Sequence, residues 1–187
     1  KAKKMADLLE NVYIVIFSPE DLRIVKDEPE KRRKFIDREL CQLKPVYYEN
    51  LSRYKKALNQ RNFLLKEERP DPALLEIWDM ELASYGAKLI IERDRFCRKL
   101  NEISRSIHND LTYGKETLKV SYESDIELRQ DDVSSQKQIF LDTLKVSREK
   151  DIYRRTTTKG PHRDDLKIEI DDIDVRNYSL STLRDKI

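Results

Sequence analysis

Residues 45–72 read PVYYENLSRYKKALNQRNFLLKEERPDP, and this stretch decides the fold. Its apolar side chains recur at spacings of 4, 3, 4 and 7 residues, which are typical of a heptad seam along one helix face: Tyr47, Leu51, Tyr54, Leu58 and Leu65. The skipped seam position is Arg61, whose guanidinium must find a partner or reach solvent. Pro70 and Pro72 then end the helix.

A second apolar seam follows directly on the proline turn. It runs through Leu75, Trp78, Leu82, Tyr85, Leu89, Phe96, Leu100, Ile103 and Ile107. Two helices with one seam each, joined by a short turn, are expected to pair as an antiparallel hairpin. We predict helices over residues 45–67 and 72–108, which form a coiled-coil-like arm of about 30 to 50 Å at about 1.5 Å per residue.

Sheet-like segments flank this arm. Residues 12–17 (VYIVIF) are apolar at both parities, as expected of a central strand, and Ser-Pro-Glu-Asp at 18–21 is typical of a helix start. Spacing further predicts a helix start at 27–30, a strand over 118–122, a surface loop over 124–135, a helix over 136–153 and a strand hairpin around 171–172. The fold class is therefore α+β and mainly helical, with a helical hairpin attached to a partial sheet.

Composition supports a helical protein without a glycine-built nucleotide site. Of 187 residues, 38% are hydrophobic, 40% are charged and only 3 are glycine, which makes a β-sandwich or a glycine-looped nucleotide fold improbable. The net charge of +2 gives no global attraction to nucleic acid or acidic lipid. Any such binding must therefore come from local patches.

Cysteine and histidine usage indicates neither a disulfide framework nor a metal site. Cys41 and Cys97 lie far apart without CxxC spacing, so a reduced, cytoplasmic protein is the default. The longest apolar run, 12–17, is far short of a membrane span of roughly 20 residues. We assign no catalytic residue, and we interpret His108 as a polar residue at a helix end. Because the chain starts at Lys1 and leads at once into helix and strand patterns, we expect an internal piece of a longer protein.

Two polar clusters are candidate functional sites. Lys31-Arg32-Arg33-Lys34 is a run of cations at a helix start, which reads as a solvated helix face or, alternatively, as a phosphate-binding patch. Thr156 to Leu166 contains Gly-Pro-His-Arg-Asp-Asp directly ahead of a strand. A Gly-Pro corner can hold these side chains at a sheet edge, where a histidine is able to switch protonation near neutral pH and an aspartate is able to orient water, a metal or an arginine. The alternative is a charged turn with an internal Arg–Asp pair.

Three of these passages together resemble the RecF family. Ser18-Pro19-Glu20-Asp21 followed by Arg32-Arg33-Lys34-Phe35-Ile36-Asp37 is similar to the family pattern of Pro-Glu-Asp-Leu and then Arg-Arg-x-Phe-Leu-Asp. Further stretches match in the same order and approximate spacing: Gln60-Arg61-Asn62 and Gly160-Pro161-His162-Arg163-Asp164-Asp165. The resemblance covers about residues 2–179. The tail, 180–187, does not continue it and stays unassigned.

The resemblance implies an arm-bearing region of an ABC-type ATPase of the SMC group. Residues 1–44 would belong to the ATPase lobe and the entry to the arm, 45–112 to the arm, and 113–179 to the return into the lobe. In the full-length parent it implies ATP and Mg as cofactors and an ATP-dependent homodimer. It also implies recognition of gapped DNA junctions, cooperation with RecR and help in loading RecA. This chain lacks the Walker A, signature and Walker B motifs, so we expect it alone to hold no cofactor and to be inactive as an ATPase.

A second hypothesis needs no ATPase. The hairpin would belong to a non-catalytic helical module that only binds another protein. A Walker A motif upstream of Lys1 in the complete gene product would distinguish the first hypothesis from the second. Under the first hypothesis, the candidate DNA contacts are Lys31, Arg32, Arg33 and Lys34.

Overall fold

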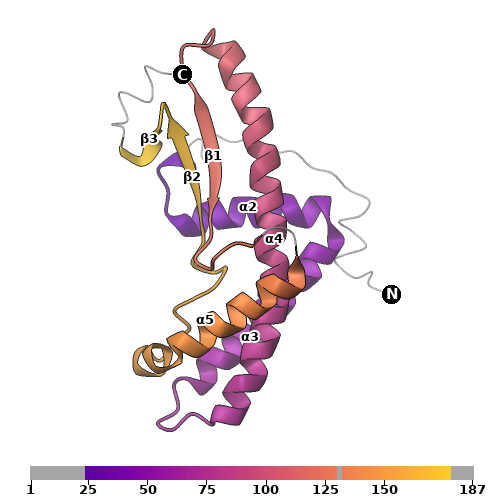
Figure 1. Cartoon of the computed structure of the whole chain (residues 1–187), viewed down its shortest axis with the longest axis vertical. Helices are drawn as coiled ribbons and strands as arrows, with labels where there is room; N and C mark the ends of the chain where they lie inside the picture. Colours follow the sequence, from indigo (N-terminus) through magenta and orange to yellow (C-terminus); the bar gives the residue numbers. More distant parts are fainter. Residues whose placement is uncertain (1–23, 130–131, 178–187) are drawn as a thin grey trace.

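The computed structural model describes residues 24–129 and 132–177 and shows an elongated molecule built along one long helix (Figure 1). Its helices are α2 (Pro29–Leu43), α3 (Pro45–Leu64), α4 (Pro72–Leu111) and α5 (Val133–Arg154). Its strands are β1 (Leu118–Glu123), β2 (Asp165–Ile170) and β3 (Ile173–Asp174), and a 3-10 turn, η2 (Val175–Asn177), follows. The predicted strand at 12–17, the helix start at 18–21 and the tail at 180–187 lie outside the described residues.

The predicted helical hairpin is confirmed. Helices α3 and α4 pack antiparallel, and the turn between them ends at Asp71, whose carboxylate accepts a hydrogen bond from the Ala73 backbone N–H at 2.8 Å. Pro72 occupies the first helical position, where its missing N–H costs nothing. The seam residues that lie in the shared core are Tyr47, Leu51, Tyr54, Leu82 and Leu89.

The seam prediction was wrong for the last part of α4. Ile103 and Ile107 are 50% and 56% exposed. The reason is length, because α4 has 40 residues and α3 only 20. Lys44, just before the start of α3, pairs with Glu92, so α3 does not extend along α4 as far as Ile103 and Ile107. The second half of α4 packs instead against β1, where the Asn101 side chain accepts a hydrogen bond from the Val120 backbone N–H at 2.7 Å.

Helix α5 adds a third layer to the arm that spacing alone did not predict. Phe140 and Leu144 are fully buried between α5 and the hairpin. Gly86 on α4 makes this approach possible, since a Cβ there would lie 2.4 Å from the Phe140 ring. The arm is therefore a small three-helix unit at this level.

The three strands form an antiparallel sheet in the order β1-β2-β3 beside the upper half of α4 (Figure 1). Leu118 pairs with Ile170 at one end of the β1–β2 ladder. The predicted turn at Asp171 and Asp172 is confirmed, and both residues have positive φ, 51° and 62°, as a two-residue type I′ hairpin requires. Helix α2 crosses the molecule near its middle and contacts β2, α3 and α4. No described helix has an apolar stretch that would span a bilayer.

Candidate functional site

The Gly160–Asp165 loop lies where α2, α3, α4 and β2 converge. Gly160 has a φ of 135°, which L side chains rarely adopt, and a Cβ there would stand 2.8 Å from the Phe140 ring and 2.9 Å from the Tyr54 hydroxyl. The loop closes on itself when the Arg163 backbone N–H donates to the Gly160 carbonyl at 2.8 Å. Glycine is therefore required at this corner by both backbone conformation and space.

Arg93 on α4 joins the loop to the helices. Its guanidinium is 3% exposed and donates to Asp37 Oδ1 on α2 at 2.9 Å, to the Tyr47 hydroxyl on α3 at 3.0 Å and to the Pro161 carbonyl at 2.6 Å. Burial is the largest single effect and disfavours the charge, but the neighbouring groups Tyr47, Asp37, Tyr122 and Asp164 together outweigh it, so the pKa of Arg93 lies well above its ordinary value. One permanently charged group thus holds three helices and the loop in register.

Asp164 is the loop's main acceptor. It is 1% exposed, and its Oδ1 accepts from the Asp125 backbone N–H at 2.8 Å while its Oδ2 lies 3.3 Å from Arg93 Nη1 and accepts from the Tyr122 hydroxyl. Its backbone carbonyl accepts from Arg33 Nη1 at 2.6 Å. Burial raises the pKa of the Asp164 carboxyl, and the Arg93 charge opposes that rise. All these donors point inward, so Asp164 is a structural acceptor in this arrangement.

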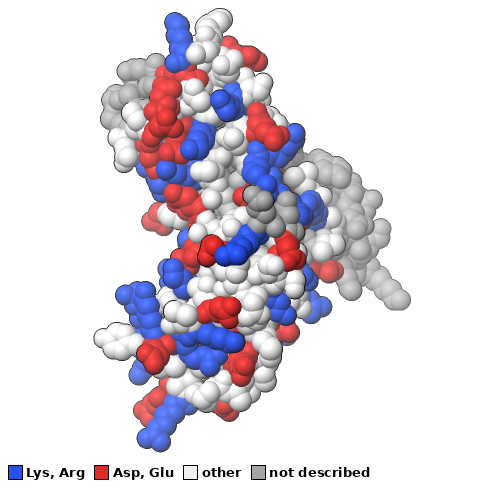
Figure 2. Space-filling model, in the orientation of Figure 1, with Lys and Arg blue, Asp and Glu red and all other residues white. Residues whose placement is uncertain are grey.

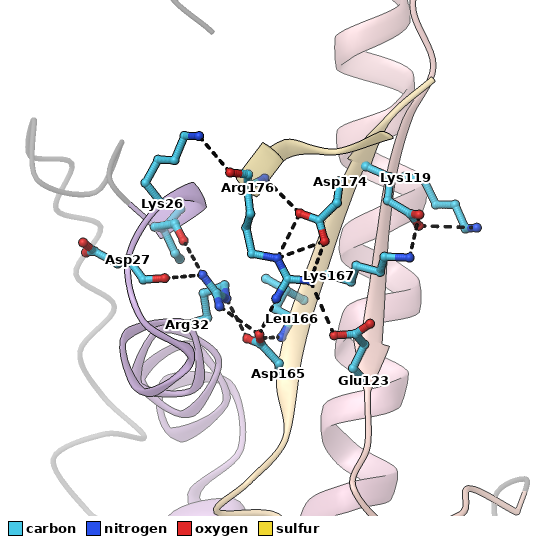
Figure 3. A network of polar contacts seen from close by, with 12 residues as sticks. Lys26, Asp27, Arg32, Lys119, Glu123, Asp165, Leu166, Lys167, Asp174 and Arg176 are labelled. Carbon is cyan, nitrogen blue, oxygen red and sulfur yellow. Dashed lines mark hydrogen bonds and ion pairs between the residues drawn. The ribbon is translucent and has the colours of Figure 1, made fainter. Parts of the chain in front are cut away.

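Asp165 opens β2 and receives two arginines (Figure 3). Arg32 on α2, 2% exposed, forms a bidentate pair with it, Nε to Oδ1 at 2.6 Å and Nη2 to Oδ2 at 2.8 Å. Arg176 Nη1 donates to the same Oδ2 of Asp165 at 3.0 Å. Arg176 also pairs with Asp174, and its Nε lies 2.9 Å from Asp174 Oδ1. Fork-to-carboxylate geometry of this kind fixes orientation as well as distance, so α2 is locked to the start of β2.

His162 is a neutral, engaged histidine. Its Nδ1 lies 2.7 Å from the Tyr54 hydroxyl and its Nε2 lies 3.1 Å from the Thr157 carbonyl oxygen. Because a carbonyl can only accept, Nε2 carries the proton and Nδ1 accepts from Tyr54. Burial lowers the pKa of His162 to about 4. The expectation that this imidazole switches near neutral pH was therefore wrong, because desolvation keeps it uncharged there.

Arg61, the guanidinium on the apolar seam, does find partners. Fully buried, it donates to Asp79 on α4 at 2.5 Å, to Asp151 on α5 at 2.7 Å and to the Thr157 hydroxyl at 2.9 Å. The neighbouring Asn62 side chain accepts from the Thr157 backbone N–H at 2.7 Å. This second polar network ties α3, α4 and α5 to the segment that leads into the Gly160–Asp165 loop.

An open groove of about 310 Å³ lies beside Arg93 and the Gly160–Asp165 loop. Lys34 at its edge is 69% exposed and pairs with Glu30 at 2.6 Å, while Arg33 is half-buried against the loop. Lys55 lies on the α3 side. The groove is lined by Glu30, Arg33, Lys34, Asp37, Leu51, Tyr54, Lys55, Leu58, Arg93 and His162.

The structure brings together most of the residues that the sequence singled out, but in inward-facing roles. Arg32, expected on a cationic surface patch, is instead an internal ion-pair partner, which leaves Lys31, Arg33 and Lys34 at or near the surface of that patch. The internal pair expected between the arginine and an aspartate of the loop was wrong. Arg163 is exposed and pairs with no described residue, and the loop aspartates pair with Arg93, Arg32 and Arg176. Gln60 is exposed on α3, and residues 18–21 lie outside the described residues.

Arg93 and Tyr122 were missed by the sequence reading. Neither follows a recognisable motif, and Arg93 is one of many charged residues on α4. Their one signal is position, since Arg93 lies four residues beyond the seam residue Leu89 and thus near the buried face of the helix.

The described residues contain no group of three or more His, Cys, Asp or Glu placed to hold a metal ion. Both cysteines are free, and burial raises the pKa of Cys97 to about 12 and of Cys41 to about 11, so neither is an activated thiolate at neutral pH. The buried ion pairs therefore hold the helices and β2 in position, and Lys34 and Lys55 line the open groove beside them.

Comparison with known proteins identifies relatives over nearly the whole chain. The chain is 45% identical over 179 residues to the DNA replication and repair protein RecF of Agathobacter rectalis, and 42% identical over 176 residues to that of Clostridium tetani. Each match covers 94% of this chain and 47% or 48% of the relative. No protein-family model matches the chain.

Solved structures agree with these relatives. The structure of the recombination mediator protein RecF-ATPrS in the RecFOR pathway superposes with a TM-score of 0.91 at 33% identity and covers 99% of this chain and 51% of that one. The corresponding RecF-ATP structure gives a TM-score of 0.90 at 32% identity.

Fold and site together define a helical arm that buried ion pairs fasten to a small antiparallel sheet. The chain belongs to the RecF family. It spans about half the length of the curated relatives it matches.

Proposed function

We propose that this chain is the arm-bearing region of a RecF-type, ATP-dependent DNA-binding protein that acts in recombinational repair and replication restart. The whole protein would bind ATP and Mg, close as a homodimer, recognise gapped DNA junctions, and help load RecA together with RecR. The observation that carries the proposal is the match to RecF proteins over 94% of the chain together with the TM-score of 0.91 to a RecF structure.

The proposed role of the buried network is mechanical. Arg93, Arg32 and Arg33 connect α2, at the entry to the arm, with the loop at its exit. A buried pair that loses one partner leaves an unpaired charge, at a cost of about 3 to 5 kcal/mol, so the two ends of the arm resist separation. A movement of the ATPase lobe would then be passed to the whole arm rather than absorbed at its root.

The proposed phosphate contacts are the cations around the groove. Lys34 and Lys55 both line the groove; the Lys34 side chain is 69% exposed, and Lys55 has no ion-pair partner among the described residues. Lys31, whose side chain is 67% exposed, lies three residues before Lys34 on α2, outside the lining. Such contacts neutralise phosphate and release counterions, so they give affinity that falls with salt and depends little on base sequence.

The test is a titration of the full-length protein that contains these residues with gapped duplex DNA, with and without ATP, at two salt concentrations. We expect ATP-dependent binding, and Lys34→Ala with Lys55→Ala should reduce the slope of log affinity against log salt by about two. Arg105→Ala with Lys115→Ala removes two exposed cations at the far end of α4 and serves as the matched control.

Two results would count against the proposal in different ways. Failure to bind gapped DNA under any nucleotide condition would refute the function and favour the non-catalytic interaction module. Binding with an unchanged salt slope in the groove variant would leave the function standing and remove the groove as its phosphate contact.

A further inference from the structure

The end of α5 that lies farthest from the sheet carries an exposed aromatic ring among cations. We call this surface the α5 tip and define it by Lys145, Lys150, Tyr153, Arg154 and Arg155. Tyr153 is 88% exposed and points away from the buried face of α5, which carries Phe140, Leu144 and Asp151. Lys150 lies three residues before Tyr153, so the ammonium and the ring share one face of the helix.

The four cations of the α5 tip are not used inside the protein. None of them has an ion-pair partner among residues 24–129 and 132–177. The other charged groups of this segment point inward, because Arg148 pairs with Asp79 at 2.7 Å and Asp151 with Arg61 at 2.7 Å. Glu149 is thus the one acid left on the exposed side of the segment 145–155. In Figure 2, Lys and Arg side chains lie over both halves of the molecule, and several of them are in the lower half, where α5 lies.

Arg155 is held in a conformation that its side chain does not favour. It is the C-cap of α5 with φ 52° and ψ 32°, the left-handed region in which helices most often place glycine. An arginine there carries a backbone cost that a glycine would avoid, and its side chain is exposed. The helix C-terminus also favours cations through its dipole, which is the purely structural explanation that a test must separate.

We propose that the α5 tip binds single-stranded DNA, with Tyr153 stacking on a base and the four cations contacting phosphates. Charge complementarity selects a polyanion, and the exposed ring selects one with unstacked bases, since bases inside a duplex offer no free face. An acidic peptide would satisfy the cations but would leave the ring without a stacking partner. The inference rests on the proposed function, because it specifies which form of DNA, the single strand, binds at this part of the molecule.

The experiment measures binding of the 187-residue chain to a fluorescent oligothymidine of about 15 nucleotides at low salt. Tyr153→Ala should weaken binding roughly 5- to 150-fold, since one base stack contributes about 1 to 3 kcal/mol, while Tyr153→Phe should keep the parent affinity. Arg155→Gly should weaken binding while the melting temperature stays equal or rises, because glycine suits the left-handed cap. Arg105→Ala with Lys115→Ala is the control and should leave the affinity close to the parent's.

Two further measurements decide the nature of the ligand. A bromodeoxyuridine-substituted strand should form its photocrosslink in the peptide that contains Tyr153. A poly-glutamate peptide that competes equally well, with no effect of Tyr153→Ala, would overturn the assignment to single-stranded DNA.

The remaining outcomes separate this inference from the proposed function. An oligothymidine affinity that is absent, or that does not change in the Tyr153 and Arg155 variants, refutes the α5 tip as a site. Full-length protein that still binds gapped duplex in that case keeps the proposed function intact.

Discussion

Arg61 illustrates how a charge can occupy the seam of a helical hairpin. Its partners Asp79 and Asp151 come from two other helices and are themselves buried, 2% and 0% exposed. Desolvating three charges offsets much of their mutual attraction, so the network is weak evidence for added stability. Its geometric consequence is stronger. The Arg61 guanidinium reaches Asp79 at 2.5 Å and Asp151 at 2.7 Å, so a shift of α3, α4 or α5 by one helical turn would break at least one of these pairs.

Residue-level prediction from the sequence succeeded where a residue broke a pattern. Arg61 interrupts an apolar seam, so its need for a partner was visible from spacing. The identity of the partners was not, because Asp151 lies 90 residues away and its approach depends on how α5 packs. Arg93 likewise stands in a gap of the second seam, between Leu89 and Phe96. Its partners could not be read from that gap, because they come from α2, α3 and the Gly160–Asp165 loop.

His162 gives a pH prediction with a defined sign. Its pKa of about 4 in the folded state lies below the ordinary value of about 6.5, so the unfolded chain binds more protons between these two values. The contribution of His162 to stability is therefore fully present above about pH 6.5 and is lost as the pH falls towards 4, by up to about 3 kcal/mol.

The measurement compares parent and His162→Gln by urea unfolding between pH 7 and pH 4. The parent should lose more stability than the variant over this range, because glutamine does not titrate. Parallel curves would mean that His162 is free to take up a proton in the folded protein. The comparison also cancels Asp164, whose raised pKa acts in the opposite direction in both proteins.

At the scale of elements, α4 is one helix with two different environments. Its first half packs in the hairpin and against α5, and its second half covers β1. Apolar periodicity located the helix to within a few residues of Pro72–Leu111, since periodicity depends on local geometry alone. It did not show where the covering partner changes, because that depends on the length of α3 and on the return of the chain through β1 and β2.

Matched aspartate substitutions test this division of α4. Leu82 is fully buried in the hairpin, so Leu82→Asp should destabilise the protein by about 3 kcal/mol or more through an unpaired buried charge. Ile103 has the same seam phase but is 50% exposed, so Ile103→Asp should cost about 1 kcal/mol or less. Chemical denaturation monitored by circular dichroism gives both values. Equal destabilisation would mean that the seam is covered along its whole length.

At the scale of the whole molecule, buried ion pairs cross both ends of the expected arm, residues 45–112. Arg32 in the segment before the arm pairs with Asp165 after it, across 133 residues of sequence. Arg93 inside the arm pairs with Asp37 before it and Asp164 after it. Arm and sheet are thus joined through charges that neither part satisfies by itself, and this favours unfolding as one unit.

Arg93→Ala is the substitution that should uncouple the unfolding of the arm from that of the sheet. It leaves Asp37 and Asp164 without their shared cation, at a cost of about 3 kcal/mol or more, or roughly 6 °C in melting temperature for a chain of this size. The single tryptophan, Trp78, packs in the arm and reports on it by fluorescence, while hydrogen exchange of the β1–β2 ladder reports on the sheet. In the parent the two probes should show one coincident transition.

In Arg93→Ala the sheet should lose protection from hydrogen exchange before Trp78 becomes solvated, because α3 and α4 keep their apolar seam. Arg105→Ala on the same helix is exposed and should leave the transitions coincident. Separate transitions already in the parent would show that the network holds the arm and sheet in place without coupling their stability, which would remove the physical basis for transmitting motion through the arm root.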